Sequence, residues 1–282
     1  MNAVDKQIKS DSTMGKNSEW NFNPRKIRGI NKVGLSMLIS KEVRRFMNVY
    51  TQTIIAPAIT TLLYYTVFAL AFGGVARTMG DMPYLTFLAP GLIMMTMVQN
   101  AFANTSSSMV IAKVAGNIVD ILMPPLSALE LYLGYVIGGI VRGLIVGLVV
   151  SIVVALVVGL AVHSLFYVIA FAILGTMLLA SIGLAAGIWS RKFDHIAAVT
   201  NFVVTPLTFL SGTFYSLSQL PPFWEKLALF NPFFYMIDGF RYGFIGQADG
   251  NVTTGLIVLS LSNIAIFILT YTMLKTGYKM KS

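Results

Sequence analysis

Side chains suited to catalysis or to transition-metal binding are scarce in this chain. It has no cysteine, which excludes disulfides, thiolate metal sites and cysteine nucleophiles. It has only two histidines, His163 and His195. Ser211 lacks the glycine two positions earlier that a nucleophile motif needs, and Gly15-Lys16 lacks the Ser or Thr that would follow in a P-loop. We therefore expect no catalytic residue, no bound metal and no ATP-binding site on this chain.

Two charged positions remain as candidates. Asp238 and Arg241 are three residues apart, so on a helix they would share a face and could pair. Arg142 is the one charge inside a long apolar run, where it either contacts other helices or extends to the headgroups. From Arg142 to Gly159 there are 17 residues, about 26 Å of helix, close to the hydrocarbon thickness. This spacing favours extension to the cytosolic headgroups.

Arg142 lies in a predicted membrane helix, and Asp238 and Arg241 lie between two such helices. Hydrophobic residues make up 56% of the 282 residues and charged residues only 11%, a composition that a soluble chain could not bury. Six apolar runs are long enough to span a bilayer: 52–73, 84–103, 131–160, 165–189, 197–217 and 255–274. The sequence predicts an all-α membrane protein with six transmembrane helices.

The distribution of Lys and Arg predicts the orientation. With both termini in the cytosol, sixteen of the 20 Lys and Arg are cytosolic, and ten of these precede the first span. Three lie outside, and Arg142 lies within a span. This asymmetry follows the positive-inside rule. Residues 1–26 are polar and are expected to form a disordered cytosolic tail, and residues 27–282 a multi-pass transmembrane domain in the cytoplasmic membrane.

A basic amphipathic helix is predicted between the tail and the first span. Apolar side chains recur there at helical spacing: Leu35, Ile39, Val43, Phe46 and Tyr50. Cations, including Arg44 and Arg45, fall largely elsewhere around the helix. Such a helix lies in the membrane interface with its cations on lipid phosphates. The alternative is a basic segment without a defined role.

The loop after the second span is expected in the cytosol and is lightly charged. Ile118, Ile121 and Leu122 fall at helical spacing, and Pro124-Pro125 would end that short helix. An apolar face in the cytosol needs a partner to cover it. The alternative is that the helix folds back on the chain's own surface.

The segment between the fifth and sixth spans, residues 218–253, is too apolar for a solvated loop. It is rich in aromatic residues and is divided by Pro221-Pro222 and Asn231-Pro232. Short helices that re-enter the outer leaflet fit this composition better than an interfacial aromatic belt alone. Small residues also recur every four positions on the third and fourth spans, which favours packing within the chain over a contact between two chains.

Taken in order, these motifs resemble those of type 2 ABC exporter permeases, the membrane subunits that work with a separate ATPase, and in particular their YadH-like branch. The pattern of the family's cytosolic coupling segment, Gly-x-Ile-x-x-x-Leu-x-x-Pro-x-Ser, is matched by Gly116, Ile118, Leu122, Pro125 and Ser127. The family often has Thr or Ser after the glycine and an acidic residue two positions further on. This chain has Asn117 and Val119 there, followed by Asp120.

The resemblance continues to the end of the chain and covers about residues 30–282. Four segments resemble the family's fifth-span exit and its re-entrant helices: Leu210–Tyr215, Leu220–Pro222, Asn231-Pro232 and Asp238–Gly243. The resemblance implies an efflux permease that moves a hydrophobic or lipid-linked substrate (drug, lipid or glycan) out of the cytoplasm. It also implies a homodimer that works with two copies of a nucleotide-binding ATPase holding the ATP and Mg, in contact with membrane lipid and with no nucleic acid.

The same resemblance implies roles for individual residues. Motion of the ATPase would reach the bundle through the segment Gly116–Ser127, including Asn117 and Asp120, and through the interfacial helix at Leu35, Ile39, Arg44 and Arg45. Asp238 and Arg241 would hold an outer gate. The substrate path would lie between two chains, lined by the first, second and fifth spans. The candidates for lining it are Tyr64, Tyr65, Phe68, Asn100, Phe102, Phe202, Thr205 and Phe209.

Two other classes of function remain. The chain could be a membrane scaffold or assembly subunit that moves nothing; an ATPase in the neighbouring reading frame would argue against this. An ion-coupled drug antiporter needs a carboxylate or histidine within the membrane, and the six predicted spans contain neither.

Overall fold

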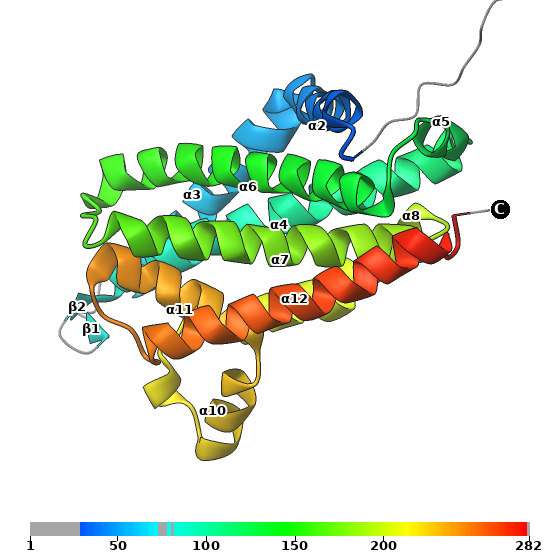
Figure 1. Cartoon of the computed structure of the whole chain (residues 1–282). Helices are drawn as coiled ribbons and strands as arrows, with labels where there is room; N and C mark the ends of the chain where they lie inside the picture. Colours follow the sequence, from blue (N-terminus) through cyan, green and yellow to red (C-terminus); the bar gives the residue numbers. More distant parts are fainter. Residues whose placement is uncertain (1–28, 73–77, 80–81, 281–282) are drawn as a thin grey trace, which may run out of the picture. The chain divides into compact units, whose positions relative to one another are not determined.

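The structure, a computed structural model, describes residues 29–72, 78–79 and 82–280, and the predicted tail 1–26 lies outside them. The described chain is almost entirely helical (Figure 1). Two short strands, β1 (Thr78–Met79) and β2 (Met82–Pro83), pair antiparallel between the first two long helices. The prediction of a helical membrane protein is confirmed.

Five stretches are long and apolar enough to cross a membrane: Thr51–Ala71, Tyr84–Val114, Ala128–Val157, Leu165–Trp189 and Val252–Thr276. They belong to the π-helical turn η1 (Thr51–Ile55) with α3 (Ala56–Phe72), then to α4 (Tyr84–Val114), α6 (Ala128–Val158), α7 (Leu165–Trp189) and α12 (Val252–Thr276). The predicted second span ends at 103, whereas α4 continues to Val114. The polar side chains in the second half of α4 are held inside the bundle. For example, Thr105 Oγ1 donates a hydrogen bond to the Ala180 carbonyl of α7 at 2.8 Å.

The predicted fifth span, 197–217, is shorter in the structure. Three consecutive segments form one helical stretch, α8 (Phe193–Val199), η2 (Thr200–Val204) and α9 (Thr205–Phe209). The chain then turns at Gly212, whose φ of +72° favours glycine, and reaches η3 (Leu217–Gln219). This stretch is not among the five that have the length of a span in the described part of the chain.

Helix α4 is the centre of the bundle, with α6 and α7 as its main neighbours and α3 and α11 on other sides. Gly143 of α6 and Gly183 of α7 approach it closely. A Cβ at these positions would lie 2.9 Å from the Met97 carbonyl oxygen and 2.5 Å from that of Phe102. The small residues of the third and fourth spans therefore serve packing within the chain.

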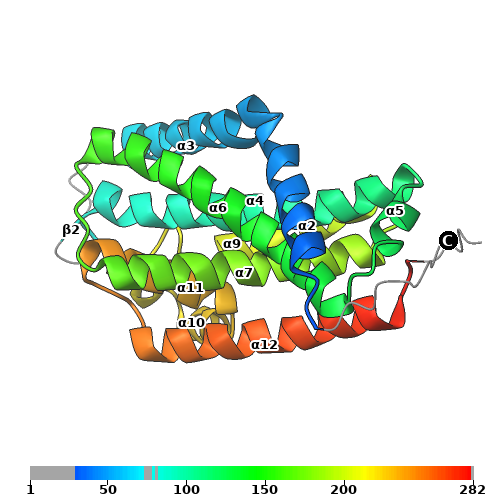
Figure 2. The same ribbon diagram turned by 45° about the horizontal axis from the view of Figure 1, so that its top comes forward.

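Shorter helices complete the fold. Helix α2 (Lys32–Met47) crosses α6, and α5 (Ile118–Leu122) follows α4 (Figure 2). Beyond α9, α10 (Pro222–Leu229) exposes its aromatic residues, whereas α11 (Pro232–Ile245) is packed against α7, α12 and α4. Two short helices thus occupy the aromatic segment where the sequence predicts them. Asn231 begins α11 by accepting a hydrogen bond from the Phe233 N–H at 3.0 Å.

Candidate functional site

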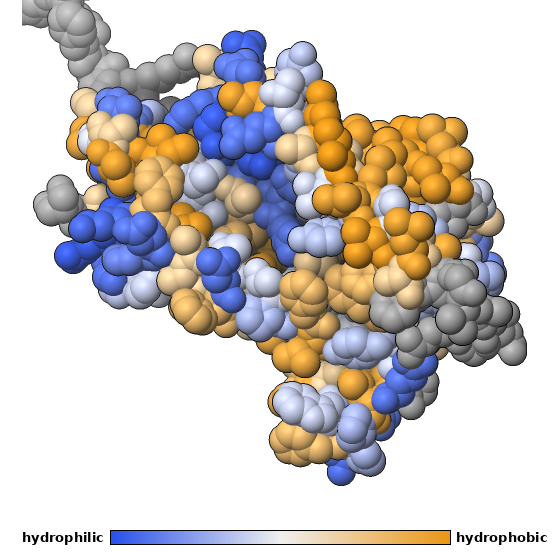
Figure 3. Space-filling model, turned by 180° about the vertical axis from the view of Figure 1, so that it is seen from behind, coloured by the Kyte–Doolittle hydropathy of each residue, from blue (hydrophilic) through white to orange (hydrophobic). Residues whose placement is uncertain are grey.

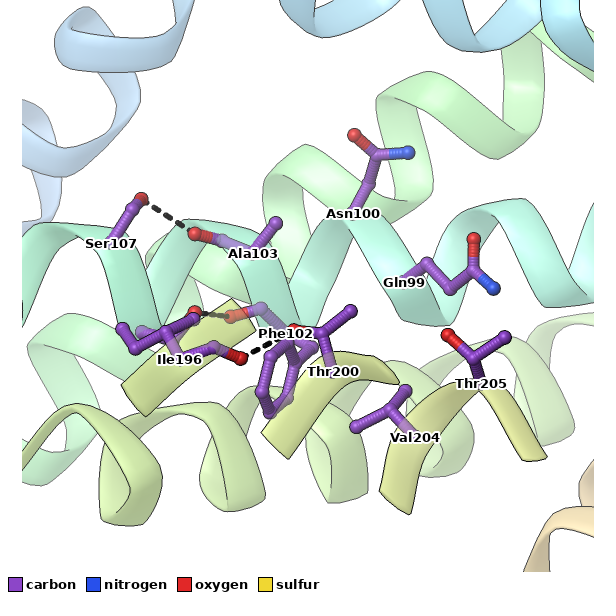
Figure 4. Close-up of a pocket in the computed structure, with 10 residues that line it drawn as sticks. Gln99, Asn100, Phe102, Ala103, Ser107, Ile196, Thr200, Val204 and Thr205 are labelled. Atoms are coloured by element: carbon purple, nitrogen blue, oxygen red, sulfur yellow. Dashed lines mark hydrogen bonds between the residues drawn. The ribbon is translucent and has the colours of Figure 1, made fainter. Parts of the chain in front are cut away.

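The candidate site is the surface of α4 between α3 and the α8–η2–α9 stretch. Two hollows meet there, and Gln99 and Asn100 line both. One hollow, of about 350 Å³, lies against α8, η2 and α9; Figure 4 shows Gln99 and Phe102 turned toward Thr200, Val204 and Thr205. The other, of about 270 Å³, lies against η1 and the first half of α3.

Apolar surfaces flank this polar strip. Figure 3 shows a face on which a hydrophilic furrow runs between hydrophobic areas. On one side of the strip, α3 exposes the apolar side chains of Ile59, Leu63, Val67 and Leu70. On the other side, η2 and α9 expose those of Phe202, Val203 and Phe209. Apolar surfaces are expected of helices in lipid, but amide side chains between such surfaces indicate a functional surface.

The structure brings together only part of the predicted substrate path. Asn100, Phe102 and Thr205 line the larger hollow, and Tyr64 lines the smaller one. Tyr65 is buried in the core. Gln99, which lines both hollows, is absent from the predicted path, although its neighbour Asn100 is included. Most of the predicted residues are aromatic, and the polar pair Gln99-Asn100 within an apolar run is the signal that could have identified Gln99.

An aromatic stack lies at the end of this surface near β1 and β2. The rings of Phe68 and Phe209 both contact the ring of Phe214, with centroids 4.9 Å and 5.2 Å away. Tyr84 Oη of α4 donates to the Phe214 carbonyl at 3.1 Å. Phe214 therefore joins Phe68 of the predicted first span to Phe209 of the predicted fifth span, although it is not among the predicted path residues. Phe202 is highly exposed and lines neither hollow.

Arg142 contacts this site through a hydrogen bond to α4. Its Nη2 donates to Asn100 Oδ1 at 3.0 Å. Arg142 is fourteen residues after Ala128, the first residue of α6, which places it about 21 Å along the helix. The structure thus supports the alternative of a contact between helices over extension to the headgroups.

A second polar cluster joins α2 to the bundle. Glu42 is fully buried and accepts hydrogen bonds from Arg45 Nη2 at 3.2 Å and from Ser108 Oγ at 2.7 Å. Arg45 also donates to Asn104 Oδ1 at 2.9 Å. Since Glu42 and Asn104 are polar, apolar periodicity does not reveal them. The usable signal is an acid three residues before Arg45 in an otherwise basic helix.

The predicted apolar face of α2 is displaced by this cluster. Leu35 and Ile39 are half-buried, and the buried side chains are Leu38, Glu42 and Phe46. Arg44 is exposed, as an interfacial cation would be, whereas Arg45 is turned into the protein.

The predicted coupling segment forms a turn, a short helix and a cap. Gly116 has a φ of +75°, which allows the sharp change of direction between α4 and α5. Asn117 precedes α5, and Asp120 is exposed on it. Ile121 is buried, so the segment partly folds back on the chain, as the alternative interpretation proposes. The exposed apolar side chains are those of Val119, Leu122 and Met123.

The end of this segment is tied to the start of α2. Ser127 caps α6 in a reciprocal arrangement in which its N–H donates to Glu130 Oε2 at 2.6 Å. The other carboxylate oxygen of Glu130 accepts from the Asn31 N–H. Asn31 Nδ2 also donates to the exposed Pro125 carbonyl at 3.4 Å. The segment and α2 are therefore mechanically connected.

The predicted Asp238–Arg241 pair forms, and it is buried. Arg241 Nη1 lies 3.8 Å from Asp238 Oδ1. Asp238 also accepts from the N–H groups of Asp249 and Gly250, each at 2.9 Å. Burial raises the pKa of the Asp238 carboxyl above its ordinary value, while Arg241 and these N–H groups act in the opposite direction.

Arg241 extends the connections of this pair. Its Nη2 donates to the Gly212 carbonyl at 2.6 Å, and its guanidinium carbon lies 3.7 Å from the centre of the Phe87 ring. The pair therefore joins α11 to the turn after α9, to α4 and to the loop before α12. Whether it gates a path stays a prediction.

The fold and this site define a helical membrane protein with a polar surface on its central helix. Within the part of the chain that the structure describes, no group of three His, Asp or Glu side chains could hold a metal ion. The chain belongs to the ABC-2 type transporter family, which it matches over residues 34–245. Permeases of this family act with ATPase subunits in ABC transporters.

Two named relatives are similar to this chain. It is 40% identical over 250 residues to the inner membrane transport permease YadH of Escherichia coli strain K12, which covers 89% of this chain and 98% of that protein. It is 27% identical over 112 residues to nodulation protein J of Rhizobium leguminosarum bv. viciae, which covers 40% of this chain and 43% of that protein. The chain is therefore a permease of the YadH-like kind.

Proposed function

We propose that this chain is the permease subunit of an ATP-driven exporter in the inner membrane. It would move a hydrophobic or lipid-linked substrate out of the cytoplasm as a homodimer, with two copies of a separate ATPase that hold the ATP and Mg. The observation that carries this proposal is the polar furrow of α4, with Gln99 and Asn100 between two hollows. Its walls come from the three helical regions that the family resemblance assigns to the path.

In this proposal the furrow faces a second copy of the chain. Each flank is apolar and exposed, and the furrow contains hydrogen-bonding groups that would be costly to leave facing lipid. A partner chain would convert the two half-open hollows into one enclosed path. The aromatic stack of Phe68, Phe209 and Phe214 would close that path at its outer end.

The proposed topology has six spans and two cytosolic termini. The stretch Phe193–Phe209 would serve as the fifth span. It is at the lower limit of spanning length, and α10 and α11 would complete the outer leaflet beside it. This arrangement places Asp238 and Arg241 at the outer end and α5 at the cytosolic end, where a cytosolic ATPase could reach it.

Energy would enter through α5 and α2 together. The exposed edge of α5, formed by Val119, Leu122 and Met123, would contact the ATPase. Because Glu130 joins the start of α2 to this segment, movement of one would be passed to the other. The cluster around Glu42 then connects α2 to α4, the helix that lines both hollows.

Co-purification with a separate ATPase subunit from the same organism tests the proposal. Leu122→Asp should abolish association, because it places a charge on the exposed docking edge without disturbing the core. Gln247→Asp is the control, since Gln247 is also exposed but lies in the loop after α11. The proposal fails if wild-type protein retains no ATPase, or if Leu122→Asp retains as much ATPase as the control and shows the same substrate-stimulated hydrolysis.

A further inference from the structure

A third hollow, of about 470 Å³, lies beside α5 at the end of the bundle opposite β1 and β2. Figures 1 and 2 show α5, the end of α12 and the connection from α7 to α8 gathered at this end. The lining comes from four parts of the chain: Lys113, Gly116, Ile118, Val119, Arg191, Lys279 and Met280. Among these residues there are three cations and no carboxylate.

The three cations differ in how they are held. The Lys113 ammonium donates to the carbonyls of Gly187, Ile188 and Ser190, so it caps the end of α7 and has no donor left for a ligand. The Arg191 side chain is exposed, and its guanidinium makes no hydrogen bond to any of the described residues. The Lys279 ammonium lies 5.0 Å from the Trp189 ring and 5.5 Å from the Tyr278 ring. Arg191 and Lys279 are thus available to an anion, with Lys113 adding positive charge behind them.

The rest of the lining suits an amphiphile better than a free anion. Ile118, Val119 and Met280 contribute apolar surface next to the cations. Trp189 and Tyr278 are half exposed beside the hollow, at 43% and 46%, and such residues mark the headgroup level of a membrane. Under the positive-inside rule, this end faces the anionic lipids of the cytosolic leaflet.

We propose that this hollow binds the phosphodiester headgroup of an acidic phospholipid, through Arg191 and Lys279. The inference rests on the proposed orientation of the permease. It also gives the lipid a regulatory role, because Gly116, Ile118 and Val119 belong both to the hollow and to the proposed coupling segment. A bound headgroup would hold α5 in place for the ATPase, so transport would depend on acidic lipid.

The test uses the full chain alone, reconstituted in nanodiscs of phosphatidylethanolamine with a minor fraction of phosphatidylglycerol. Retained phosphatidylglycerol is counted by native mass spectrometry. Each cation contributes about fivefold to binding at an anionic surface, so Arg191→Gln with Lys279→Gln should lower retention by about 25-fold. The control variant Lys192→Gln with Lys275→Gln removes the same charge from the same two regions, at exposed positions outside the hollow. It should change retention by less than about twofold.

Three results would overturn the proposal. Equal losses in the two double variants would mean diffuse attraction to the surface. Displacement of the lipid by millimolar inorganic phosphate would mean a site for small anions. In a separate co-purification, loss of ATPase association in the Arg191/Lys279 variant, with phosphatidylglycerol retention unchanged, would mean that the hollow receives an acidic protein segment. Lipid retention is measured without the ATPase, so a failure of the lipid site leaves the permease assignment intact. In the same way, a failure to retain the ATPase leaves the measured lipid retention unaffected.

Discussion

Arg142 and Asn100 are joined by a 3.0 Å hydrogen bond between α6 and the helix that lines both hollows. Asn100 in turn donates from Nδ2 to the Thr96 carbonyl at 3.0 Å. The Nε of Arg142 is buried and has no partner among the residues that the structure describes. The Arg142 guanidinium is therefore held in place by one amide, that of Asn100, which lines both hollows.

Removing Asn100 should be more damaging than removing both partners. Asn100→Leu leaves the Arg142 guanidinium without its acceptor, so we expect the free energy of unfolding to fall by about 1.5–3 kcal/mol. The double variant Asn100→Leu with Arg142→Leu should lose less than Asn100→Leu alone, because no unpaired charge remains. SDS titration of the protein in mixed micelles measures both. Gln99→Leu is the control, and an equal loss there would show that the hydrogen bond has no special weight.

The Glu42–Arg45 pair should respond asymmetrically to the loss of each partner. Glu42 is fully buried, whereas the Arg45 side chain is 26% exposed. Arg45→Met leaves a buried carboxylate with Ser108 as its remaining hydrogen-bond donor, and should cost about 3–5 kcal/mol of unfolding free energy.

Glu42→Gln should cost less, because Arg45 can turn toward water or lipid phosphates. The same SDS titration compares the two variants. Arg44→Met removes an exposed cation of the same helix and should change stability by less than about 0.5 kcal/mol. If Glu42→Gln is the more damaging variant, the predicted asymmetry between the two partners is wrong.

The Asp238–Arg241 pair should show strong coupling between its partners. Because both side chains are buried, Asp238→Leu or Arg241→Met alone should cost about 3–5 kcal/mol of unfolding free energy, and the double variant clearly less than the sum. Transport should fall in parallel if the pair holds the outer gate. Lys226→Met, at an exposed position of α10, is the control. Additive, near-neutral effects on both stability and transport would exclude a gate at this position.

Opposite ends of α12 should lie on opposite sides of the membrane. The chain has no native cysteine, so single cysteines report cleanly. Gln247→Cys, in the exposed loop just before α12, should react in intact cells with a membrane-impermeant maleimide. Thr276→Cys, at the other end of α12, should react only after the membrane is opened. Labelling of Thr276→Cys from outside would reverse the proposed orientation, and protection of both positions would place the loop before α12 inside the protein.

Much of the fold follows from local properties of the sequence. Mean hydropathy over about 20 residues is enough to locate a membrane helix, since every residue of the span must be tolerated by lipid or by other helices. The bounds of α7 agree with the predicted 165–189 for this reason. Local chemistry also predicts the short helix ended by Pro124-Pro125 and the pairing of Asp238 with Arg241, because residues three or four apart on a helix are neighbours wherever that helix lies.

Properties that depend on distant residues required the tertiary structure. The extension of α4 to Val114 could not be predicted from hydropathy, because its polar residues are satisfied by α2 and α7, which are far away in the sequence. The position of Arg142 is decided in the same way, since only packing places Asn100 within hydrogen-bond distance. Composition and spacing thus determined that the chain is a helical membrane protein, and the distribution of its cations predicts which way it is oriented. Which polar groups meet inside it was decided by the tertiary structure, since a buried polar group is stable only where folding supplies its partner.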